Sequence, residues 1–337
     1  MGVSFGDIIP KHEIDFDHLK DKEIAIDAMN SMYQFLSIIR QPDGTPLKDS
    51  RGRVTSHLSG LFYRTINLIE KGIKPIYVFD GEPPRLKSHT IEERVETRKK
   101  AQIEWKKALE VEDFESARKH AQAALRLDEY MIESSEKLLT LMGVPFIKAP
   151  SEGEAQAAYM CAKGSVWAVG SQDYDSLLFG APRLVRNLAI TGKRKLPGRN
   201  VYVDVSIEII ELKEVLSTLE LKNISQLIDM GILVGTDYNP RGIEGYGPKK
   251  ALSLIKEFGS LKNAGIDVES YEEIFDIFIN PKVTDDYELE WRESDETGII
   301  DFLCGKFDFS EERVKKAISK LKAHEETKKQ SQLDKWF

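Results

Sequence analysis

Six acidic residues stand shortly after apolar segments of the kind that form buried strands. They come from four separate stretches of the chain: Asp27, Asp80, Glu152, Glu154, Asp173 and Asp175. In a parallel sheet the carboxyl ends of the strands share one edge, and ligands bind at that edge. Six carboxylates gathered there would repel one another strongly unless cations neutralised them. The sequence therefore predicts a metal centre.

The donor type indicates which metal and which chemistry to expect. Carboxylate oxygens without neighbouring Cys or His favour hard divalent cations, which indicates Mg²⁺, with Mn²⁺ as a possible substitute. Two such ions about 4 Å apart can activate a water molecule and stabilise the leaving oxygen when a phosphodiester is hydrolysed. We therefore expect two Mg²⁺ ions and hydrolysis of a phosphate ester.

Each acid also has an ordinary structural interpretation when it is taken alone. Asp27 could cap the helix that follows it, Ser151 and Glu154 could form a capping box, and the other acids could lie in turns or solvated loops. The six together fit these interpretations less well than they fit a metal site. A seventh acid, Asp237, follows a predicted helix, and nothing in its local sequence places it at the same edge.

Two basic segments could face a phosphate backbone. Residues 85–107 hold eight basic residues, of which Lys87 and Arg94 lie seven apart and would share one face of a helix. Both could reach a phosphate held over the metals. Residues 183–199 hold six basic residues and no acid. A solvated helix with internal ion pairs and a charged surface hairpin are the alternatives.

A third basic segment, residues 242–251, has the sequence features of a phosphate site. Glycines leave backbone N–H groups open there, and Pro248 is suited to the first position of a helix. Lys249 and Lys250 then fall in the first helical turn, where cations oppose the helix dipole unless an anion is bound. The pattern favours phosphate binding, although a glycine-rich turn by itself is a weak signal.

The elements that must position these residues predict an α/β fold. Strands are expected at residues 23–27, 75–79, 144–148, 166–170 and 201–205, with helices between them. This alternation predicts a mainly parallel, twisted sheet with helices on both faces, in a single domain of residues 1–322. After residue 206 we expect mostly helix. The charged residues 85–130 should protrude, the acidic residues 267–301 should be a solvated surface, and residues 323–337 should be a flexible tail without regular structure.

Composition narrows the class of protein without choosing its partner. The 337 residues are 41% hydrophobic and 31% charged, with a net charge of −8 and two distant cysteines. An acidic balance does not exclude nucleic acid, because acids for metals and bases for phosphates occupy different places. Two separated cysteines suit reduced thiols. Without a membrane span or a signal peptide, we expect a cytoplasmic protein, nuclear only if the source is eukaryotic.

Five motifs together resemble the flap endonuclease family, especially its archaeal members. They are IDAMNSMYQ around Asp27, YVFDGEPP around Asp80, APSEGEAQA around Glu152, GSQDYDS around Asp173 and GTDY around Asp237, in the order found in the family. The resemblance covers the whole chain. It implies a 5′-nuclease (PIN-like) fold, with a helical arch at about residues 85–130 and a helix–two-turn–helix DNA-binding element at about residues 240–258.

The resemblance also implies roles for single residues. The family holds two metals with seven carboxylates, which match the six acids above and Asp237. Lys87 and Arg94 match the catalytic arch residues, Gly2 matches the N-terminal glycine near the site, and Tyr33 matches a tyrosine that stacks on the substrate. Periodicity alone would place Tyr33 in the core. The DNA-binding element, which is aided by K⁺ in the family, would use Gly245, Gly247, Lys249 and Lys250.

The last residues resemble the motif by which proteins bind a sliding clamp. The motif consists of Gln330, Leu333, Trp336 and Phe337. A one-turn helix would place the three apolar side chains on one face for a pocket of the partner, which the resemblance implies to be PCNA. The alternative is a tail that packs on its own domain.

The activity implied by the resemblance is that of a structure-specific 5′-flap endonuclease with an associated 5′–3′ exonuclease activity. It would cut DNA at the flap junction during Okazaki-fragment maturation and DNA repair, as a monomer without a membrane partner. Two alternatives stay open. One is a catalytically inert, clamp-bound DNA scaffold, and the other is an RNA nuclease or a phosphatase that uses the same carboxylate edge.

Overall fold

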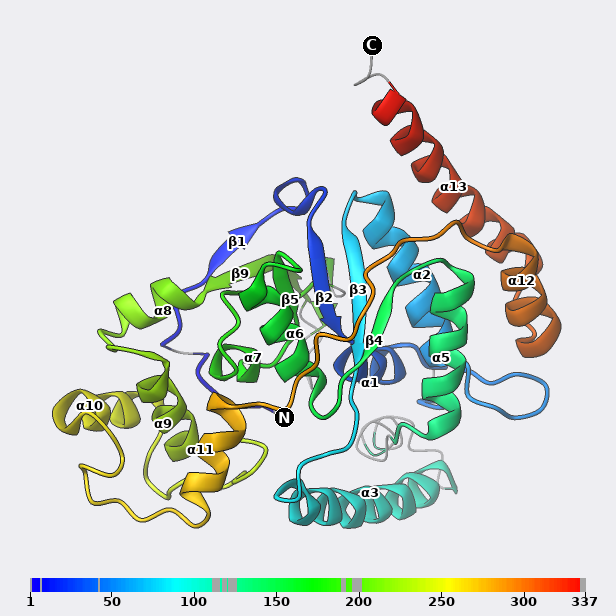
Figure 1. The fold of residues 1–337 in the computed structure, drawn as a ribbon. Helices are drawn as coiled ribbons and strands as arrows, with labels where there is room; N and C mark the ends of the chain where they lie inside the picture. Colours follow the sequence, from blue (N-terminus) through cyan, green and yellow to red (C-terminus); the bar gives the residue numbers. More distant parts are fainter. Residues whose placement is uncertain are drawn as a thin grey trace.

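A seven-stranded sheet with the order β1-β9-β6-β5-β2-β3-β4 runs through the centre of the molecule (Figure 1). The five strands from β6 to β4 are parallel, and β9 and β1 add an antiparallel edge. In chain order the strands are β1 (His12–Ile14), β2 (Glu23–Asp27), β3 (Lys74–Phe79), β4 (Phe146–Lys148), β5 (Ala168–Gly170), β6 (Arg183–Arg186) and β9 (Ile207–Glu211).

The computed structural model describes residues 2–6, 8–41, 43–110, 116, 120, 126–188, 192–195 and 202–333. Within these ranges it does not describe the side chains of residues 88–95, 106, 108–110, 192–195, 202–204 and 323–333. No helix in this described part of the chain is long and apolar enough to cross a membrane.

Helices cover both faces of the sheet, as predicted. Strand β2 alternates between two apolar layers: Ala25 packs into one, and Ile24 and Ile26 pack into the other. Burial on both faces is typical of a parallel strand. The Ala25 layer is covered by α6 (Gly153–Lys163), α7 (Asp175–Leu178), α8 (Leu212–Thr218), α9 (Ile224–Val234), α10 (Pro248–Phe258) and α11 (Tyr271–Ile279). The opposite layer is covered by α1 (Ala28–Ile38), α2 (Ser56–Glu70), α5 (Glu129–Leu141), α12 (Glu296–Ile300) and the first turns of α13 (Glu311–Leu333).

The first strand–helix unit shows how local sequence fixes this arrangement. Asp27 ends β2 and caps α1, because its Oδ1 accepts a hydrogen bond from the Asn30 backbone N–H at 2.9 Å. Met32, Phe35 and Leu36 then recur at helical spacing and are buried against the sheet. The strand and the helix predicted here are both confirmed, and the turn between them lies at the carboxyl edge of the sheet.

The antiparallel part of the fold differs from the prediction. Residues 207–211 were expected in a helical region but form β9, which pairs with β1 and β6. Strand β8 (Tyr202–Val205) exists as predicted, yet it pairs with β7 (Gly192–Lys195) in a separate two-stranded sheet. These strands are short, and pairing between distant segments decides where they lie. Local periodicity therefore could not place them.

Residues 85–130 contain the long charged helix α3 (Lys87–Glu110). In Figure 1 this helix lies outside both helical layers, below the carboxyl ends of β2 and β3. Its exposed Ile103 and its many charged residues fit a helix that buries little surface. Residues 111–115, 117–119 and 121–125, which belong to the predicted arch, lie outside the described residues.

Residues 281–295 form an irregular strap that joins α11 to α12 across the body. The buried amide of Gln156 holds it, because Gln156 Nε2 donates to the Thr284 carbonyl at 2.9 Å and Gln156 Oε1 accepts from the Thr284 N–H at 2.8 Å. Lys163 adds an ion pair with Asp285. Ile274 and Phe278 of α11 are buried. Apolar residues of this segment therefore pack on the body, while most of its acidic side chains are exposed, as the expectation of a solvated acidic surface has it.

The C-terminal helix α13 continues past the predicted start of the tail. Its first turns pack on α2 and bury Val314, Ile318 and Leu321. The helix then extends away from the body as far as Leu333 (Figure 1). The expectation of irregular backbone from residue 323 is wrong up to this point, because Lys, Glu and Gln favour helix and no Pro or Gly interrupts them. The side chains of Gln330 and Leu333, and all of Trp336 and Phe337, lie outside the described residues.

Candidate active site

Asp27 and Asp80 stand at the ends of two neighbouring parallel strands. Asp27 is the last residue of β2, and Asp80 follows β3 directly. Asp80 Oδ1 accepts a hydrogen bond from the Gly153 backbone N–H at 2.7 Å, at the start of α6. This bond ties the second strand end to the helix that carries the next two acids. Asp27 caps α1 and also lies close to other acids of the edge. A capping role and a role in the acidic cluster are therefore compatible.

Glu152 and Glu154 belong to the beginning of α6, but the predicted capping box is absent from this helix. Glu152 occupies the cap position without a side-chain bond to the helix, and Ser151 Oγ donates to the Glu82 carbonyl. Glu154 instead accepts a hydrogen bond from Ser171 Oγ at 2.6 Å. The capping-box alternative is therefore wrong. The Glu154 side chain bonds to Ser171, which follows β5, and not to the backbone at the start of its own helix.

Asp173 and Asp175 follow β5 and lie against the N-terminal segment. Asp175 Oδ1 accepts a hydrogen bond from the Val3 backbone N–H at 2.7 Å, and Asp173 Oδ2 accepts one from Asn30 Nδ2 at 2.9 Å. A Cβ atom on Gly2 would lie 2.9 Å from atoms of both aspartates. Only glycine fits this approach without displacing a carboxylate. The structure thus places Gly2 at the site, as expected.

Lys87 joins the seventh acid to the cluster. Its Nζ donates to Glu152 and lies 3.5 Å from Asp237 Oδ2. Asp237 follows α9, so the third dimension brings it to an edge where its local sequence could not place it. Arg94 belongs to the same helix, α3, seven residues after Lys87. Its side chain lies outside the described residues. Lys87 thus links α3 directly to Glu152 and Asp237.

The electrostatics of the cluster reflect crowding. Burial raises the pKa of Asp27 to about 8, helped by the charges of Asp80 and Asp173. Burial likewise raises the pKa of Asp175 to about 7, helped by Asp237 and Asp173. The pKa values of Asp80, Glu152 and Glu154 are also raised, mainly by burial. Such a set of carboxylates favours any cation that can replace its protons.

Lys87 responds to the same field in the opposite direction. Burial by itself would lower the pKa of Lys87, but the carboxylates of Glu152 and Asp237 outweigh burial and raise it. Its ammonium group also lies 5.5 Å from the centre of the Tyr238 ring, within range of a cation–π interaction. Lys87 is therefore held in its charged form at the centre of the acidic edge.

The donor set of the cluster fits a divalent cation. Lys87 contacts two of the seven carboxylates, Glu152 and Asp237, and carboxylate oxygens are the donors that Mg²⁺ and Mn²⁺ prefer. No three acidic, histidine or cysteine side chains within the described ranges already form a complete ligand set around one point. Several of the acids are turned toward N–H groups, hydroxyls or Lys87 instead. Metal binding therefore requires side-chain rotation within a cluster that is already assembled.

Tyr33 lies on the arch side of α1 and is not a core residue. Its ring is half-buried, its hydroxyl accepts a hydrogen bond from Arg98 at 3.3 Å, and the Arg98 guanidinium lies 5.7 Å from the ring centre. Periodicity alone predicted burial, whereas contact with α3 keeps the ring at the surface beside the site. A flat ring facing a cationic helix is suited to stacking.

The start of α10 has the backbone geometry that the sequence predicted. Gly247 caps the helix, Pro248 follows in its first turn, and Gly245 adopts a positive φ of 83°. Lys249 and Lys250 are exposed in the first turn. Gly245, Lys249 and Lys250 line an open hollow together with Tyr246, Ser253 and Leu254 and two acids, Glu244 and Glu257. In Figure 1, α9, α10 and α11 form a lobe to one side of the carboxyl edge, and α3 lies on its other side.

The basic segment 183–199 divides into two parts. Arg183 donates to the Trp167 carbonyl and stacks on the Trp167 ring, while Arg186 donates to the Gln172 carbonyl and to the Tyr174 hydroxyl. Both arginines serve the fold of the β5–β6 region. The side chains of Lys193, Arg194, Lys195 and Arg199 lie outside the described residues.

Asn30 and Tyr238 are site residues that sequence reasoning did not single out. Asn30 contacts two of the predicted metal carboxylates, and Tyr238 supports Lys87. Both lie inside the motifs that surround Asp27 and Asp237, so motif membership is the signal that could have found them. Their spacing alone gives no such indication.

Two family models match the chain. The XPG N-terminal domain model matches residues 1–101, and the XPG I-region model matches residues 143–237. Asp27 and Asp80 fall in the first range, and the other five acids fall in the second. The two models therefore cover every carboxylate of the cluster.

Known proteins are similar over the full length. The chain is 59% identical over 342 residues to flap endonuclease 1 of Pyrococcus furiosus, which covers 100% of this chain and 99% of that protein. It is 57% identical over 341 residues to flap endonuclease 1 of Archaeoglobus fulgidus, with 100% of both chains covered. Identity of this degree over whole chains shows a shared family.

Solved structures agree with the sequence comparison. Flap endonuclease-1 from Methanococcus jannaschii superposes with a TM-score of 0.79 and 49% identity, over 97% of this chain and 100% of that one. The catalytic core of Rad2 in complex with a DNA substrate gives a TM-score of 0.71 and 25% identity, over 95% and 100% of the two chains. The chain therefore belongs to the flap endonuclease family and is a metal-dependent, structure-specific nuclease that hydrolyses DNA phosphodiester bonds at 5′ flaps.

Proposed function

We propose that the seven carboxylates hold two Mg²⁺ ions, which Mn²⁺ can replace, at the flap junction of the DNA. The ligands would be Asp27, Asp80, Glu152, Glu154, Asp173, Asp175 and Asp237. When bound, the ions would supply an activated water and would neutralise charge on the leaving oxygen. The observation that carries this proposal is the convergence of acids from distant segments on Lys87, since crowding without cations would be costly.

Lys87 and Arg94 would act on the scissile phosphate. Lys87 Nζ stands among the acids and keeps its proton, so it can donate to a phosphate oxygen that enters the cluster. In doing so it would exchange its contact with Glu152 for one with the substrate and free that carboxylate for a metal ion. Positive charge at this place stabilises the extra negative charge that develops as the phosphate is attacked. Arg94 would contribute from the same face of α3.

The rest of the DNA would be held on either side of this edge. Gly245, Gly247, Lys249 and Lys250 would bind the duplex backbone, with a K⁺ ion at the glycine turn. The support is that all four residues are exposed and that there is open space beside both glycines. Tyr33 would stack on a base next to the cut, and Gly2 would let the N-terminus approach the site. The 5′ strand would pass beneath α3, the arch of residues 85–130.

The test of the proposed reaction is cleavage of a labelled 5′-flap duplex with Mg²⁺ and with EDTA. Single-stranded DNA and an RNA hairpin of matched length serve as competing substrates. We expect cutting at the flap junction that requires metal and prefers the flap, together with slower 5′–3′ removal of nucleotides from a nicked duplex. Flap binding without cutting would favour the inert scaffold, and preference for RNA or for a simple phosphate ester would favour the other alternative.

The C-terminal residues would bind a sliding clamp, PCNA, while the nuclease works as a monomer. The support is the sequence of the tail, with Gln330, Leu333, Trp336 and Phe337 spaced as a clamp-binding motif. Clamp binding would place the enzyme at Okazaki-fragment junctions and repair sites in the cytoplasm of an archaeal cell. Replacing Trp336 and Phe337 by Ala should abolish binding to immobilised PCNA and leave cleavage of a free flap unchanged. Retained binding would contradict the assignment.

A further inference from the structure

Asn30 forms a bridge between two of the carboxylates that come from different strands. Its backbone N–H donates to Asp27 Oδ1 and its side-chain Nδ2 donates to Asp173 Oδ2, each at 2.9 Å. Asp27 ends β2, whereas Asp173 follows β5. One residue in the first turn of α1 thus fixes the spacing of two acids that are far apart in sequence.

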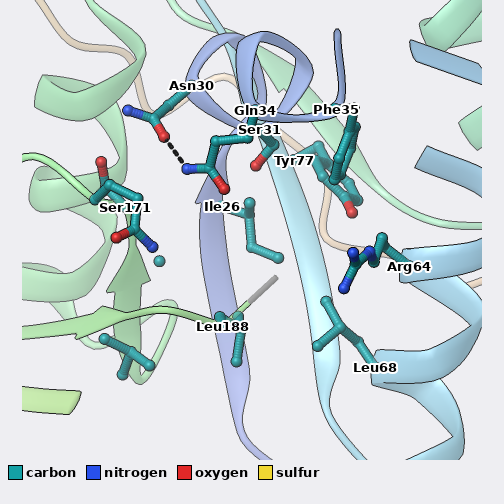
Figure 2. Close-up of a pocket in the computed structure, with 13 residues that line it drawn as sticks. Ile26, Asn30, Ser31, Gln34, Phe35, Arg64, Leu68, Tyr77, Ser171 and Leu188 are labelled. Atoms are coloured by element: carbon teal, nitrogen blue, oxygen red, sulfur yellow. Dashed lines mark hydrogen bonds between the residues drawn. The ribbon is translucent and has the colours of Figure 1, made fainter. Parts of the chain in front are cut away.

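The amide of Gln34 fixes the orientation of Asn30. Gln34 Nε2 donates to Asn30 Oδ1 at 2.5 Å, one helical turn further along α1 (Figure 2). Asp173 determines which groups donate and which accept in these hydrogen bonds, because an ionised carboxylate can only accept. Asn30 must therefore donate to Asp173, its oxygen must accept, and Gln34 must donate to it.

The fixed direction of these hydrogen bonds determines where the side-chain oxygen of Gln34 lies. Gln34 Oε1 is buried and has no hydrogen-bond partner among the described residues. Figure 2 shows the Gln34 side chain at a small cavity lined by Ile26, Ser31, Tyr77 and Leu188. Buried acceptors without partners are rare in folded proteins. The opposite orientation of Gln34 would turn its oxygen toward the oxygen of Asn30, and reversing both amides would turn an oxygen toward Asp173.

We infer that Asn30 and Gln34 form a positioning relay that holds Asp173, together with Asp27, in the arrangement that binds metal. In this role the two residues act through the carboxylates of Asp27 and Asp173. Partners that orient ligands in this way typically change metal affinity by roughly 10- to 100-fold when they are removed. This inference rests on the proposed metal-binding role of Asp27 and Asp173.

The test is Mn²⁺ binding by the full chain without DNA, followed through the electron paramagnetic resonance signal of free Mn²⁺. Asn30→Leu removes the donor to Asp173 at nearly constant volume and should weaken Mn²⁺ binding roughly 10-fold. Affinity for flap DNA in EDTA should not change, and saturating Mn²⁺ should restore cleavage. A merely structural role would not produce this separation of metal affinity from DNA affinity.

Gln34→Glu gives the sharper result. Above the pKa of the introduced carboxyl group the side chain can only accept, so the Asn30 amide must turn its nitrogen toward it and present its oxygen to Asp173. Mn²⁺ binding should weaken although the variant gains a negative charge, whereas simple electrostatics predicts tighter binding. Gln34→Met should weaken it less, because it removes the constraint on Asn30 without reversing the amide. Tighter or unchanged binding by Gln34→Glu, measured at a pH at which the introduced carboxyl group is ionised, would overturn the relay.

Two further variants separate the possible failures. Ser31→Ala changes the next residue of α1 at the same cavity without touching an acid, and it should bind Mn²⁺ as the wild type does. Asp173→Asn should weaken binding more than any relay variant. If Asp173→Asn binds Mn²⁺ normally, the proposed metal site is wrong. Thermal melting in EDTA shows whether Asn30→Leu and Gln34→Glu are folded. If both are folded and bind Mn²⁺ normally while Asp173→Asn binds it weakly, only the relay is wrong.

Discussion

The carboxylate edge and the start of α10 both concentrate charge, but they hold it in opposite ways. At the edge, Asp27 and Asp175 are 6% and 5% exposed, and each lies close to other acids. At the start of α10, Lys249 and Lys250 stand in the open. Buried charge interacts strongly and is little screened, whereas exposed charge interacts weakly and is sensitive to salt. The first arrangement suits chemistry, and the second suits a grip on DNA that can be released.

The largest effect should follow from removing one buried acid. Asp175→Ala should reduce cleavage of a 5′ flap at least about 1,000-fold, on the scale seen when groups that act together lose a member. Flap binding should remain, because Asp175 does not belong to the open cationic surfaces. Quench-flow kinetics and fluorescence anisotropy measure the two quantities. Asp229→Asn changes a buried acid that accepts hydrogen bonds from Tyr271 and Leu261, and it should leave cleavage intact. An equal loss of cleavage in both variants would mean that the acids of the edge are no more important for cleavage than another buried acid.

Lys87 is the cation of the buried region, and its removal should cost almost as much. Lys87→Ala should lower the single-turnover rate by roughly 100- to 1,000-fold, with little change in DNA affinity. Lys107→Ala is the matched control, since Lys107 lies on the same helix in an exposed pair with Glu104. If Lys87→Ala instead lowers DNA affinity and leaves the single-turnover rate unchanged, Lys87 serves to bind DNA, as proposed for the exposed lysines of α10.

The buried acids should also make stability depend on pH. The pKa values of about 8 for Asp27 and about 7 for Asp175 lie above the ordinary value of 3.8, so the folded chain keeps protons that the unfolded chain loses. The free energy of unfolding should therefore fall as pH rises from about 4 to about 8. Thermal melting in EDTA should show this fall, and saturating Mg²⁺ should reduce it.

Asp27→Asn tests the cause of that pH dependence. Removing one charge from the crowded edge should raise the melting temperature in EDTA at pH 8 by at least about 2 °C and flatten the pH dependence. Cleavage should be lost at the same time. Asn can still accept the hydrogen bond from the Asn30 N–H, so a variant that melts lower at every pH would show that repulsion among the acids does not limit stability.

The smallest effects should come from the open lysines. Lys249→Ala and Lys250→Ala should each weaken duplex binding by about 1 kcal/mol and reduce the slope of log affinity against log salt by about 0.9. The rate of cutting at saturating DNA should not change. Lys256→Ala is the control, because Lys256 lies in the last turn of the same helix, paired with Glu220. An unchanged salt slope would mean that these lysines do not contact phosphates.

Several features of this protein were determined by the sequence alone. The strands that carry Asp27 and Asp80, the helices on both faces and the charged helix outside them all follow from local apolar patterns and turn residues. The family resemblance added Asp237, Tyr33 and Gly2 to the site. Such features are predictable because burial and capping act over a few residues, and their signals stay within one segment.

Other features were decided only by tertiary structure. Ser151 and Glu154 form no capping box because Glu82 and Ser171, from other segments, bond to them. Strand β9 forms because β1 and β6 lie beside it, and Asp237 reaches the edge because α9 packs beneath the sheet. The physical reason is the same in each case. Hydrogen bonds and ion pairs between distant segments outweigh weak local preferences, and spacing along the chain carries no record of them.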